Sequence, residues 1–387
     1  MPAPLYLLAL AVFAMGTSEF MLAGLLPDLA ADLGVTVGTA AALSTAYAVG
    51  MAVGAPLTAA FARAWPPRRA LLGFVLGFAA AHVLGAVTTS FPVLFATRVT
   101  AAVANAGFLA VALTTAATLV PPDQKGRALA VLLAGTTAAT VAGVPGGAAL
   151  GAVLGWRAAF WAVAALCLPA AVGVLTGVPA RRARRDPADG PALRTELAQL
   201  ARPRLILVML LGALVNAATF AGLTFLAPVV TGAAGLGDLW VPVALVLFGA
   251  GSCTGVTVAG RLSDRHPGAV VAVTGPLLLL GWPALAVLAA EPAALLTLVL
   301  VQGALSFALG STLITRVLYE AAGAPTLAGS CATTALNAGA ATGPLAGAAA
   351  LGTGAGELGP LWASGLLVLV ALSVAYPLRG SLRPRHL

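Results

Sequence analysis

Charged side chains are scarce in this chain. Asp, Glu, Lys and Arg together make up 8% of its 387 residues, whereas a soluble globular domain has about 25%. Apolar side chains account for 60%, and the mean hydropathy is +1.02. So few polar groups cannot cover the surface of a water-soluble domain, and the composition therefore excludes an ordinary soluble protein.

Cysteine and histidine are also rare. Cys167, Cys253 and Cys331 lie inside apolar runs, are odd in number and lack metal-ligand spacing, so we expect neither a disulfide framework nor a metal site. The three histidines lie far apart and offer no acid-base set, which argues against an enzyme and against a bound cofactor. The net charge of +8 could indicate nucleic-acid binding, but the basic residues lie between apolar runs, where they are better explained by membrane topology.

Long apolar runs, in contrast, recur along the whole chain. Each has about the 17 to 25 residues that cross a bilayer, and in lipid such a run must be helical because its backbone finds no water to bond. The first run lacks the basic start of a signal peptide, so we interpret it as a span. The sequence predicts an all-α membrane protein with twelve spans, near residues 5–27, 39–61, 70–88, 93–117, 128–150, 158–178, 204–227, 241–259, 269–290, 293–318, 327–351 and 361–377.

The positions of the basic residues predict the orientation of these spans. Cytoplasmic loops of membrane proteins carry an excess of Lys and Arg. If the N-terminus is cytoplasmic, every basic residue except Arg98 and Arg157 falls at a cytoplasmic position. We therefore expect both termini in the cytoplasm.

A polar stretch and an internal repeat divide the spans into two sets of six. We expect an N-terminal half at 1–178, a cytoplasmic linker at 179–203, and a C-terminal half with a short cytoplasmic tail at 204–387. Two six-helix halves in the same orientation are typical of a parallel repeat with the substrate site between the halves. Small residues recur at every fourth position in spans five and eleven, at an offset of 200: Gly135, Ala139, Gly143 and Gly147, and then Ala335, Gly339, Gly343 and Gly347.

Three ionisable side chains lie well inside predicted spans. Glu19, His82 and Arg98 all fall in the outer half of the membrane, where an ionisable residue is costly and is a functional candidate by default. Burial favours a protonated carboxyl and a nearby guanidinium favours the carboxylate, so Glu19 and Arg98 could load and release a proton as the protein changes conformation. A static ion pair is the alternative. His82 could join such a proton relay, since histidine titrates near neutral pH, or it could be a structural residue.

Polar and aromatic side chains on the same spans are candidates for a substrate cavity. An apolar pocket with a few hydrogen-bonding groups suits a drug-sized ligand, although each of these residues could equally be a packing residue. The candidates are Thr17, Ser18, Phe20, Asn105, Phe108, Asn216, Phe220, Gln302 and Asn337.

Several short motifs could serve conformational change. The small residues in spans five and eleven allow neighbouring helices to approach closely, and Pro145 and Pro344 add kinks. The segments GVPGG (143–147) and GPLAG (343–347) contain these residues. The loop GRLSDRHPG (260–268) contains Asp264 and Arg265. The corresponding N-terminal segment, ARAWPPRRALLG (62–73), has Ala62 at the position that matches Asp264.

Longer segments resemble one known family. They are GTSEFMLAGLLPDLAADLGV (16–35), GMAVGAPLTAAFARAWPPRRALLGF, LFATRVTAAVANAG (94–107) and VAGVPGGAALGAVLGWRAAFW. In order and spacing they resemble the actinobacterial chloramphenicol exporters, within the drug:proton antiporters of the major facilitator superfamily. The resemblance is strong over the N-terminal half and looser in the C-terminal half. It implies two six-helix halves around a central cavity, alternating access, and proton-driven export of chloramphenicol or a related phenicol across the bacterial cytoplasmic membrane.

Within this interpretation, the partners are a small drug, protons and the lipid bilayer, and the protein works as a monomer. Two other functions remain open. Related exporters that carry sugars, purines or other metabolites share the TxEF and GLLP patterns, so the substrate could be a metabolite. A sensor or scaffold without transport is disfavoured, because the chain has no sizeable soluble output domain.

Overall fold

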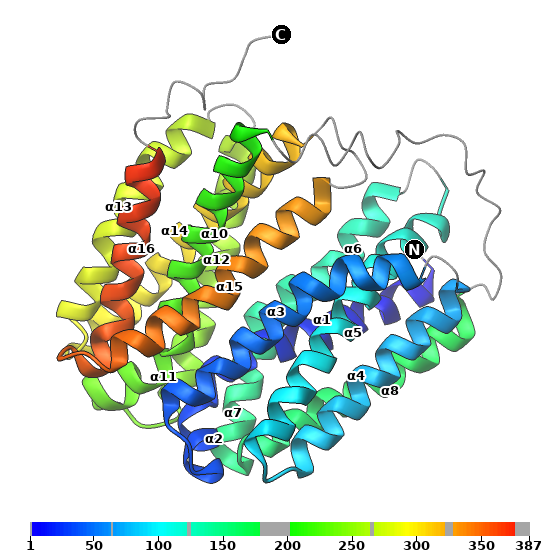
Figure 1. The fold of residues 1–387 in the computed structure, drawn as a ribbon, viewed down its shortest axis with the longest axis horizontal. Coiled ribbons are helices and arrows are strands. Elements are labelled where there is room, and N and C mark those ends of the chain that lie inside the picture. Colours follow the sequence, from blue (N-terminus) through cyan, green and yellow to red (C-terminus); the bar gives the residue numbers. More distant parts are fainter. Residues whose placement is uncertain are drawn as a thin grey trace. The chain divides into compact units, whose positions relative to one another are not determined.

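The computed structural model describes residues 2–62, 65–121, 125–178, 202–263, 267–321 and 328–375. All regular elements in these ranges are helices. The chain divides into two compact units, Met1–Arg185 and Asp186–Leu387. Figure 1 shows that each unit is a bundle of long helices, with the first unit coloured blue to cyan-green and the second green to red.

Six long helical segments build the N-terminal unit in its described residues. One of them is interrupted by a π-helical turn, so that α6, η3 and α7 follow one another without a loop. The segments are α1 (Ala3–Phe20), α3 (Val37–Ala62), α4 (Pro67–Val87), α5 (Phe91–Thr118), α6 (Lys125–Ala138) with η3 (Ala139–Gly143) and α7 (Val144–Leu154), and α8 (Trp156–Gly177), with the short η1 (Met21–Gly24) and α2 (Leu26–Leu33) between α1 and α3.

The described residues of the C-terminal unit likewise contain six long helices. In both units short elements follow the first long helix: η1 and α2 follow α1, and α11 and the π-helical turn η4 follow α10. The elements are α10 (Pro203–Thr224), α11 (Leu226–Pro228), η4 (Val229–Ala233), α12 (Trp240–Ser263), α13 (Pro267–Val287), α14 (Pro292–Glu320), α15 (Ala328–Leu351), η5 (Gly356–Leu358) and α16 (Gly359–Ala375).

Eleven of these long segments are long and apolar enough to cross a membrane. The remaining one, α15, has 24 residues, which is ample length, but its sequence is rich in Gly, Ala and Thr and includes Asn337. It packs against α10, α14 and α16 of its own unit. A helix with much of its surface against other helices needs fewer large apolar side chains than one that mainly faces lipid. The predicted all-α, multi-pass membrane fold is confirmed.

Most predicted spans begin within three residues of the observed helices. Proline occupies the first turn of α4, α5, α10 and α14, where the missing N–H has no intrahelical acceptor and the fixed φ suits the helix. The prediction for the first span, residues 5–27, is wrong at its end. The α-helix stops at Phe20, and Pro27 lies in the first turn of a separate helix, α2, where proline is tolerated for the same reason.

The repeat of small residues brings backbones together in the N-terminal unit. A Cβ on Gly135 of α6 would collide with the carbonyl oxygen of Ala9 in α1, and a Cβ on Gly143 would collide with the side chain of Thr17. The segment from α6 to α7 therefore lies directly against α1, in the helix that carries Ser18 and Glu19.

The corresponding residues of the C-terminal unit do the same. A Cβ on Gly339 of α15 would collide with the carbonyl oxygen of Ala213 in α10, and one on Gly343 with that of Ala217. The pairing of α10 with α15 thus repeats the pairing of α1 with α6 and η3. The sequence repeat at an offset of 200 has the same structural meaning in both units.

Candidate functional site

A buried arginine is the centre of the polar site in the N-terminal unit. The side chain of Arg98 on α5 is 1% exposed. Its Nη1 donates to Ser18 Oγ at 2.7 Å, and its Nη2 donates to the Ser18 carbonyl oxygen at 2.8 Å. The guanidinium therefore forms two hydrogen bonds with one residue of α1. The guanidinium carbon lies 4.3 Å from the centre of the Tyr47 ring, within the range of a cation–π contact. Neutral acceptors and an aromatic face therefore hold this positive charge.

The hydrogen bonds around His82 fit a neutral imidazole best. His82 Nδ1 lies 2.8 Å from the Phe78 carbonyl oxygen, which can only accept, so Nδ1 carries a proton. His82 Nε2 lies 2.7 Å from Ser18 Oγ. Because Ser18 Oγ already accepts from Arg98, its own proton is free to be donated to Nε2, and a neutral imidazole satisfies every partner. A second proton on His82 would put two donors on Ser18 Oγ and a second positive charge beside Arg98.

Packing also fixes the imidazole of His82. The ring is 1% exposed, and its centre lies 4.3 Å from that of Phe78 and 5.6 Å from that of Phe160. These contacts hold the imidazole in place beside Ser18.

Tyr47 extends the network to a fourth helix, α3, and Asn105 of α5 bonds to it. Asn105 Nδ2 donates to the Tyr47 hydroxyl at 3.0 Å, and the Tyr47 hydroxyl donates to the Met15 carbonyl oxygen at 3.4 Å. We call Ser18, Tyr47, His82, Arg98 and Asn105 the arginine network. It joins α1, α3, α4 and α5. Sequence reasoning missed Tyr47, although a tyrosine inside a run of small and aliphatic residues is the same signal that singled out Asn105.

Glu19 lies beside this network without a bond to it. Its charge interacts with that of Arg98, but no hydrogen bond or ion pair joins the two side chains in the described part of the chain. Successive residues of a helix point about 100° apart, so Ser18 can face α5 while Glu19 faces elsewhere. Glu19 is partly exposed, whereas Ser18 is fully buried. The structure therefore does not contain the static Glu19–Arg98 ion pair that was one alternative.

The remaining cavity candidates of the N-terminal unit lie at different depths. Thr17 donates to the Phe13 carbonyl oxygen of its own helix and packs against Gly143, so it is a packing residue between α1 and η3. Phe108 is fully buried, whereas Phe20 is partly exposed. Of the five cavity candidates in the N-terminal unit, only Ser18 and Asn105 belong to the arginine network.

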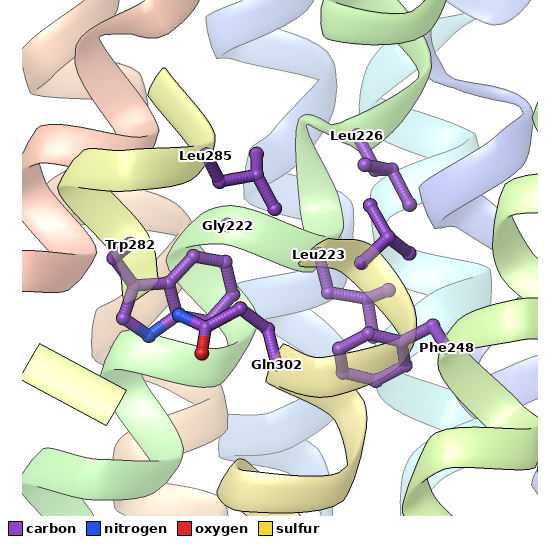
Figure 2. Close-up of a pocket in the computed structure, with 8 residues that line it drawn as sticks. Gly222, Leu223, Leu226, Phe248, Trp282, Leu285 and Gln302 are labelled. Carbon is purple, nitrogen blue, oxygen red and sulfur yellow. The ribbon is translucent and has the colours of Figure 1, made fainter. Parts of the chain in front are cut away.

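The candidates of the C-terminal unit serve different helix contacts. Asn216 Nδ2 donates to the Leu336 carbonyl oxygen at 2.6 Å and so links α10 to α15. Asn337 donates to the Thr333 carbonyl oxygen of its own helix, and Phe220 lies against Gly343. Gln302 lines a separate small cavity (Figure 2). Of these four residues, only Gln302 lines this cavity.

The structure describes five of the seven residues that were predicted to serve conformational change. Gly143 faces Thr17 of α1, and a Cβ on Gly147 would reach ordinary contact with Met21 of η1. Pro145 lies in the first turn of α7, which follows η3, and a π-helical turn is a known source of a local bend. Gly343 packs against α10, Pro344 lies inside α15, and Asp264 and Arg265 fall outside the described residues.

A second polar cluster explains the basic residue that broke the predicted orientation rule. Arg157, at the start of α8, forms an ion pair with Asp32 of α2 and also donates to the Thr88 carbonyl oxygen at the end of α4. Trp156 Nε1 donates to the same Asp32 carboxylate at 3.2 Å, and the Arg157 guanidinium lies over the Trp156 ring. Arg157 is thus neutralised locally, so its charge opposes the predicted topology less than an unpaired arginine would.

Within the described ranges, no three His, Cys, Asp or Glu side chains come together to hold a metal ion. The polar groups instead form hydrogen bonds between helices that are otherwise apolar. Bundles of helices long and apolar enough to cross a membrane, with a buried hydrogen-bond network around an arginine, define a multi-pass membrane protein.

Comparison with known proteins gives the family. The family model described as Major Facilitator Superfamily matches residues 8–344, and the chain belongs to this superfamily. It is therefore a transporter and not an enzyme. A "Chloramphenicol resistance protein" of Streptomyces lividans is 75% identical over 379 residues, which cover 98% of this chain and 97% of the relative. An "Inner membrane transport protein YdhP" of Escherichia coli K12 is 32% identical over 322 residues, which cover 83% of this chain and 82% of that protein.

Solved structures share the fold at low sequence identity. A bacterial homologue of the human lysosomal transporter Spinster, in an inward-facing and occupied conformation, superposes with a TM-score of 0.78 at 17% identity and covers 97% of this chain and 96% of its own. The nucleoside transporter NupG has a TM-score of 0.73 at 14% identity, with 96% of this chain and 98% of its own covered. These similarities establish the fold alone.

Proposed function

We propose that this protein exports chloramphenicol or a related phenicol across the bacterial cytoplasmic membrane by proton-driven alternating access, with both termini in the cytoplasm. The relative that is 75% identical over nearly the whole of both chains is named for chloramphenicol resistance, which supports this substrate.

Glu19 is the proposed proton carrier. It is the only carboxylate well inside a predicted span, and it is partly exposed. It directly follows Ser18, which accepts hydrogen bonds from Arg98. This juxtaposition is the observation that carries the proposal. Protonation from outside removes the negative charge of Glu19, and loss of the proton to the inside restores it.

Arg98 is the proposed partner of that charge. Its Nη groups are both bonded to Ser18, but its Nε has no hydrogen-bond partner although it is buried. An unmatched donor and an uncompensated positive charge favour an approaching carboxylate. A change in the rotation or tilt of α1 would alter the distance between Glu19 and Arg98, and so would couple the proton to the conformation of the protein.

The test is transport in inverted membrane vesicles. An imposed proton gradient should drive accumulation of chloramphenicol by the unmodified protein, and Glu19→Gln should abolish that accumulation while the variant still reaches the membrane. Glu291→Gln is the matched control, because Glu291 is an exposed carboxylate that precedes α14 and lies outside the helices. It should transport normally.

Undiminished gradient-driven uptake by Glu19→Gln would refute the assignment of the proton site. Absence of phenicol uptake by the unmodified protein, together with proton flux in response to a sugar or a purine, would refute the substrate. Exchange of one proton for one neutral drug moves a charge, so uptake should also respond to the membrane potential. Uptake that ignores the potential would reject that stoichiometry.

A further inference from the structure

The internal repeat includes one contact that is built differently in the two units. The offset of 200 relates Asp32 to Gly232 and Arg157 to Glu357. Asp32 forms an ion pair with Arg157. A Cβ on Gly232 would collide with Glu357 Oε2 and would lie 2.7 Å from Glu357 Oε1, so the Glu357 carboxylate lies directly against the Gly232 backbone. The same two positions therefore meet in each unit.

In the N-terminal unit, polar bonds hold this contact together. Asp32, in the last turn of α2, accepts from Trp156 Nε1 and from the guanidinium of Arg157 at the start of α8. Arg157 also donates to the Thr88 carbonyl oxygen at the end of α4. A carboxylate in the last turn of a helix opposes the helix dipole, so Asp32 contributes to stability through α8 rather than through α2. We call the Asp32–Arg157 pair with Trp156 the charged contact.

The C-terminal unit keeps the position of this contact and lacks its charges. The segment AGE (355–357) stands where the N-terminal unit has GWR (155–157), so both donor side chains are missing, and Gly232 replaces the acceptor. Glu357 is exposed and forms no ion pair or hydrogen bond with any residue that the structure describes. An exposed carboxylate is solvated equally well before and after it leaves a glycine backbone. We call this pair the glycine contact.

Both contacts join the connection after the first long helix of a unit to the start of its sixth long helix. The charged contact joins α2 to α8, and the glycine contact joins η4 to η5, which directly precedes α16. In the proposed orientation these connections face the outer side. Separating the two elements would loosen the outer end of a unit.

We propose that the glycine contact is the one that opens during transport: η4 separates from η5 and α16, while the charged contact keeps α2 on α8. The reason is the difference in attraction, because separating Asp32 from Arg157 breaks an ion pair and separating Gly232 from Glu357 breaks no polar bond. The opening is a step of the proposed alternating access and so rests on the proposed function. It can nevertheless be measured without a substrate.

The first test adds the missing charge. Gly232→Lys places an ammonium group beside Glu357, and Gly232→Gln is the matched control, with a side chain of similar reach and no charge. Hydrogen–deuterium exchange with mass spectrometry follows the amides of η4 and η5. They should exchange about two- to fivefold more slowly in Gly232→Lys than in Gly232→Gln, the effect of one exposed ion pair on an opening contact. Glu357→Gln should abolish the difference. Equal exchange in the Lys and Gln proteins would overturn the proposal.

The second test joins each contact covalently. In a protein whose three native cysteines are replaced by alanine, one variant carries Gly232→Cys with Glu357→Cys, and the other carries Asp32→Cys with Arg157→Cys. A short bifunctional methanethiosulfonate links either pair, and dithiothreitol releases the link. Linking the first pair should stop gradient-driven uptake of chloramphenicol until dithiothreitol is added. Linking the second pair should leave uptake unchanged.

The outcomes separate this proposal from the proposed function. Undiminished uptake with the first pair linked, or equal loss of uptake with either pair linked, would overturn the assignment of the glycine contact. Absence of chloramphenicol uptake by the unmodified protein would instead refute the substrate. The exchange of η4 and η5 would then decide on its own whether the glycine contact opens.

Discussion

Replacing Gly143 should reveal how closely the α6–η3–α7 segment must approach α1. Gly143 has φ −69° and ψ −46°, which alanine adopts freely, so a penalty for Gly143→Ala cannot come from backbone strain. A Cβ at this position would overlap Thr17 Oγ1, and it would lie 3.0 Å from Thr17 Cβ and 3.1 Å from Thr17 Cγ2. Overpacking of this kind costs about 1–3 kcal/mol.

Gly146→Ala is the matched control for this effect. Gly146 lies on the same helix, three residues away, and a Cβ there meets no atom within 4 Å. Exchanging glycine for alanine inside a helix stabilises by about 0.5–1 kcal/mol when space allows, so the two variants should change stability in opposite directions. Thermal unfolding in detergent, followed by the far-ultraviolet circular dichroism of the helices, measures both.

A double variant tests whether Thr17 is the obstacle. Thr17→Ala removes Oγ1 and Cγ2, two of the three atoms that Gly143→Ala would meet. The Thr17→Ala/Gly143→Ala protein should therefore be more stable than the sum of the single changes predicts, by about 1 kcal/mol or more. Equal destabilisation by Gly143→Ala and Gly146→Ala, or strict additivity of the two changes at Thr17 and Gly143, would refute this reasoning. Gly143→Ala should also reduce gradient-driven uptake, because Thr17 directly precedes Ser18, the residue that is hydrogen-bonded to Arg98.

Three further predictions concern polar contacts. Ser18→Ala should destabilise the protein by about 2–3 kcal/mol in thermal unfolding, because Arg98 loses a charged hydrogen bond and His82 loses its only Nε2 partner; a neutral result would contradict the arginine network. Tyr47→Phe should keep most of the cation–π contact with Arg98 and Tyr47→Leu should lose it, so unfolding should occur earlier in the Leu variant by about 1 kcal/mol. The side chains of Asp32 and Arg157 are 42% and 32% exposed. A double-mutant cycle should therefore give a coupling energy of about 1 kcal/mol or less between them, and this energy should fall as salt is added. A larger coupling energy that does not depend on salt would contradict the exposure of the pair.

The pattern of apolar runs determined most of the fold. The lengths of the runs, the prolines in the first turns and the repeat of small residues depend on local geometry and on the bilayer thickness, and the structure follows them closely. The break after Phe20 is an exception. Hydropathy is continuous through residues 21–27, and only the backbone conformation separates α1 from η1 and α2.

The sequence also selected most of the ionisable residues of the site, because a charge inside an apolar run is conspicuous. It indicated Glu19, His82 and Arg98, and it left open whether Glu19 pairs statically with Arg98. Tertiary structure decided that question. Whether two side chains meet depends on the rotation of each helix about its axis, which hydropathy does not encode. The rotation of α1 turns Ser18, rather than Glu19, toward Arg98 and His82.

Tertiary structure alone revealed three further features: the Tyr47 ring beneath Arg98, the pairing of Arg157 with Asp32, and the unmatched atoms of Trp282 and Gln302. Tyr47 and Arg98 lie 51 positions apart, and Asp32 and Arg157 lie 125 apart. Trp282 and Gln302 lie on different helices, α13 and α14. Such residues become neighbours only when the helices pack. Composition determines that such helices lie in a membrane, whereas the packing of each bundle decides which buried polar atoms find a hydrogen-bond partner and which do not.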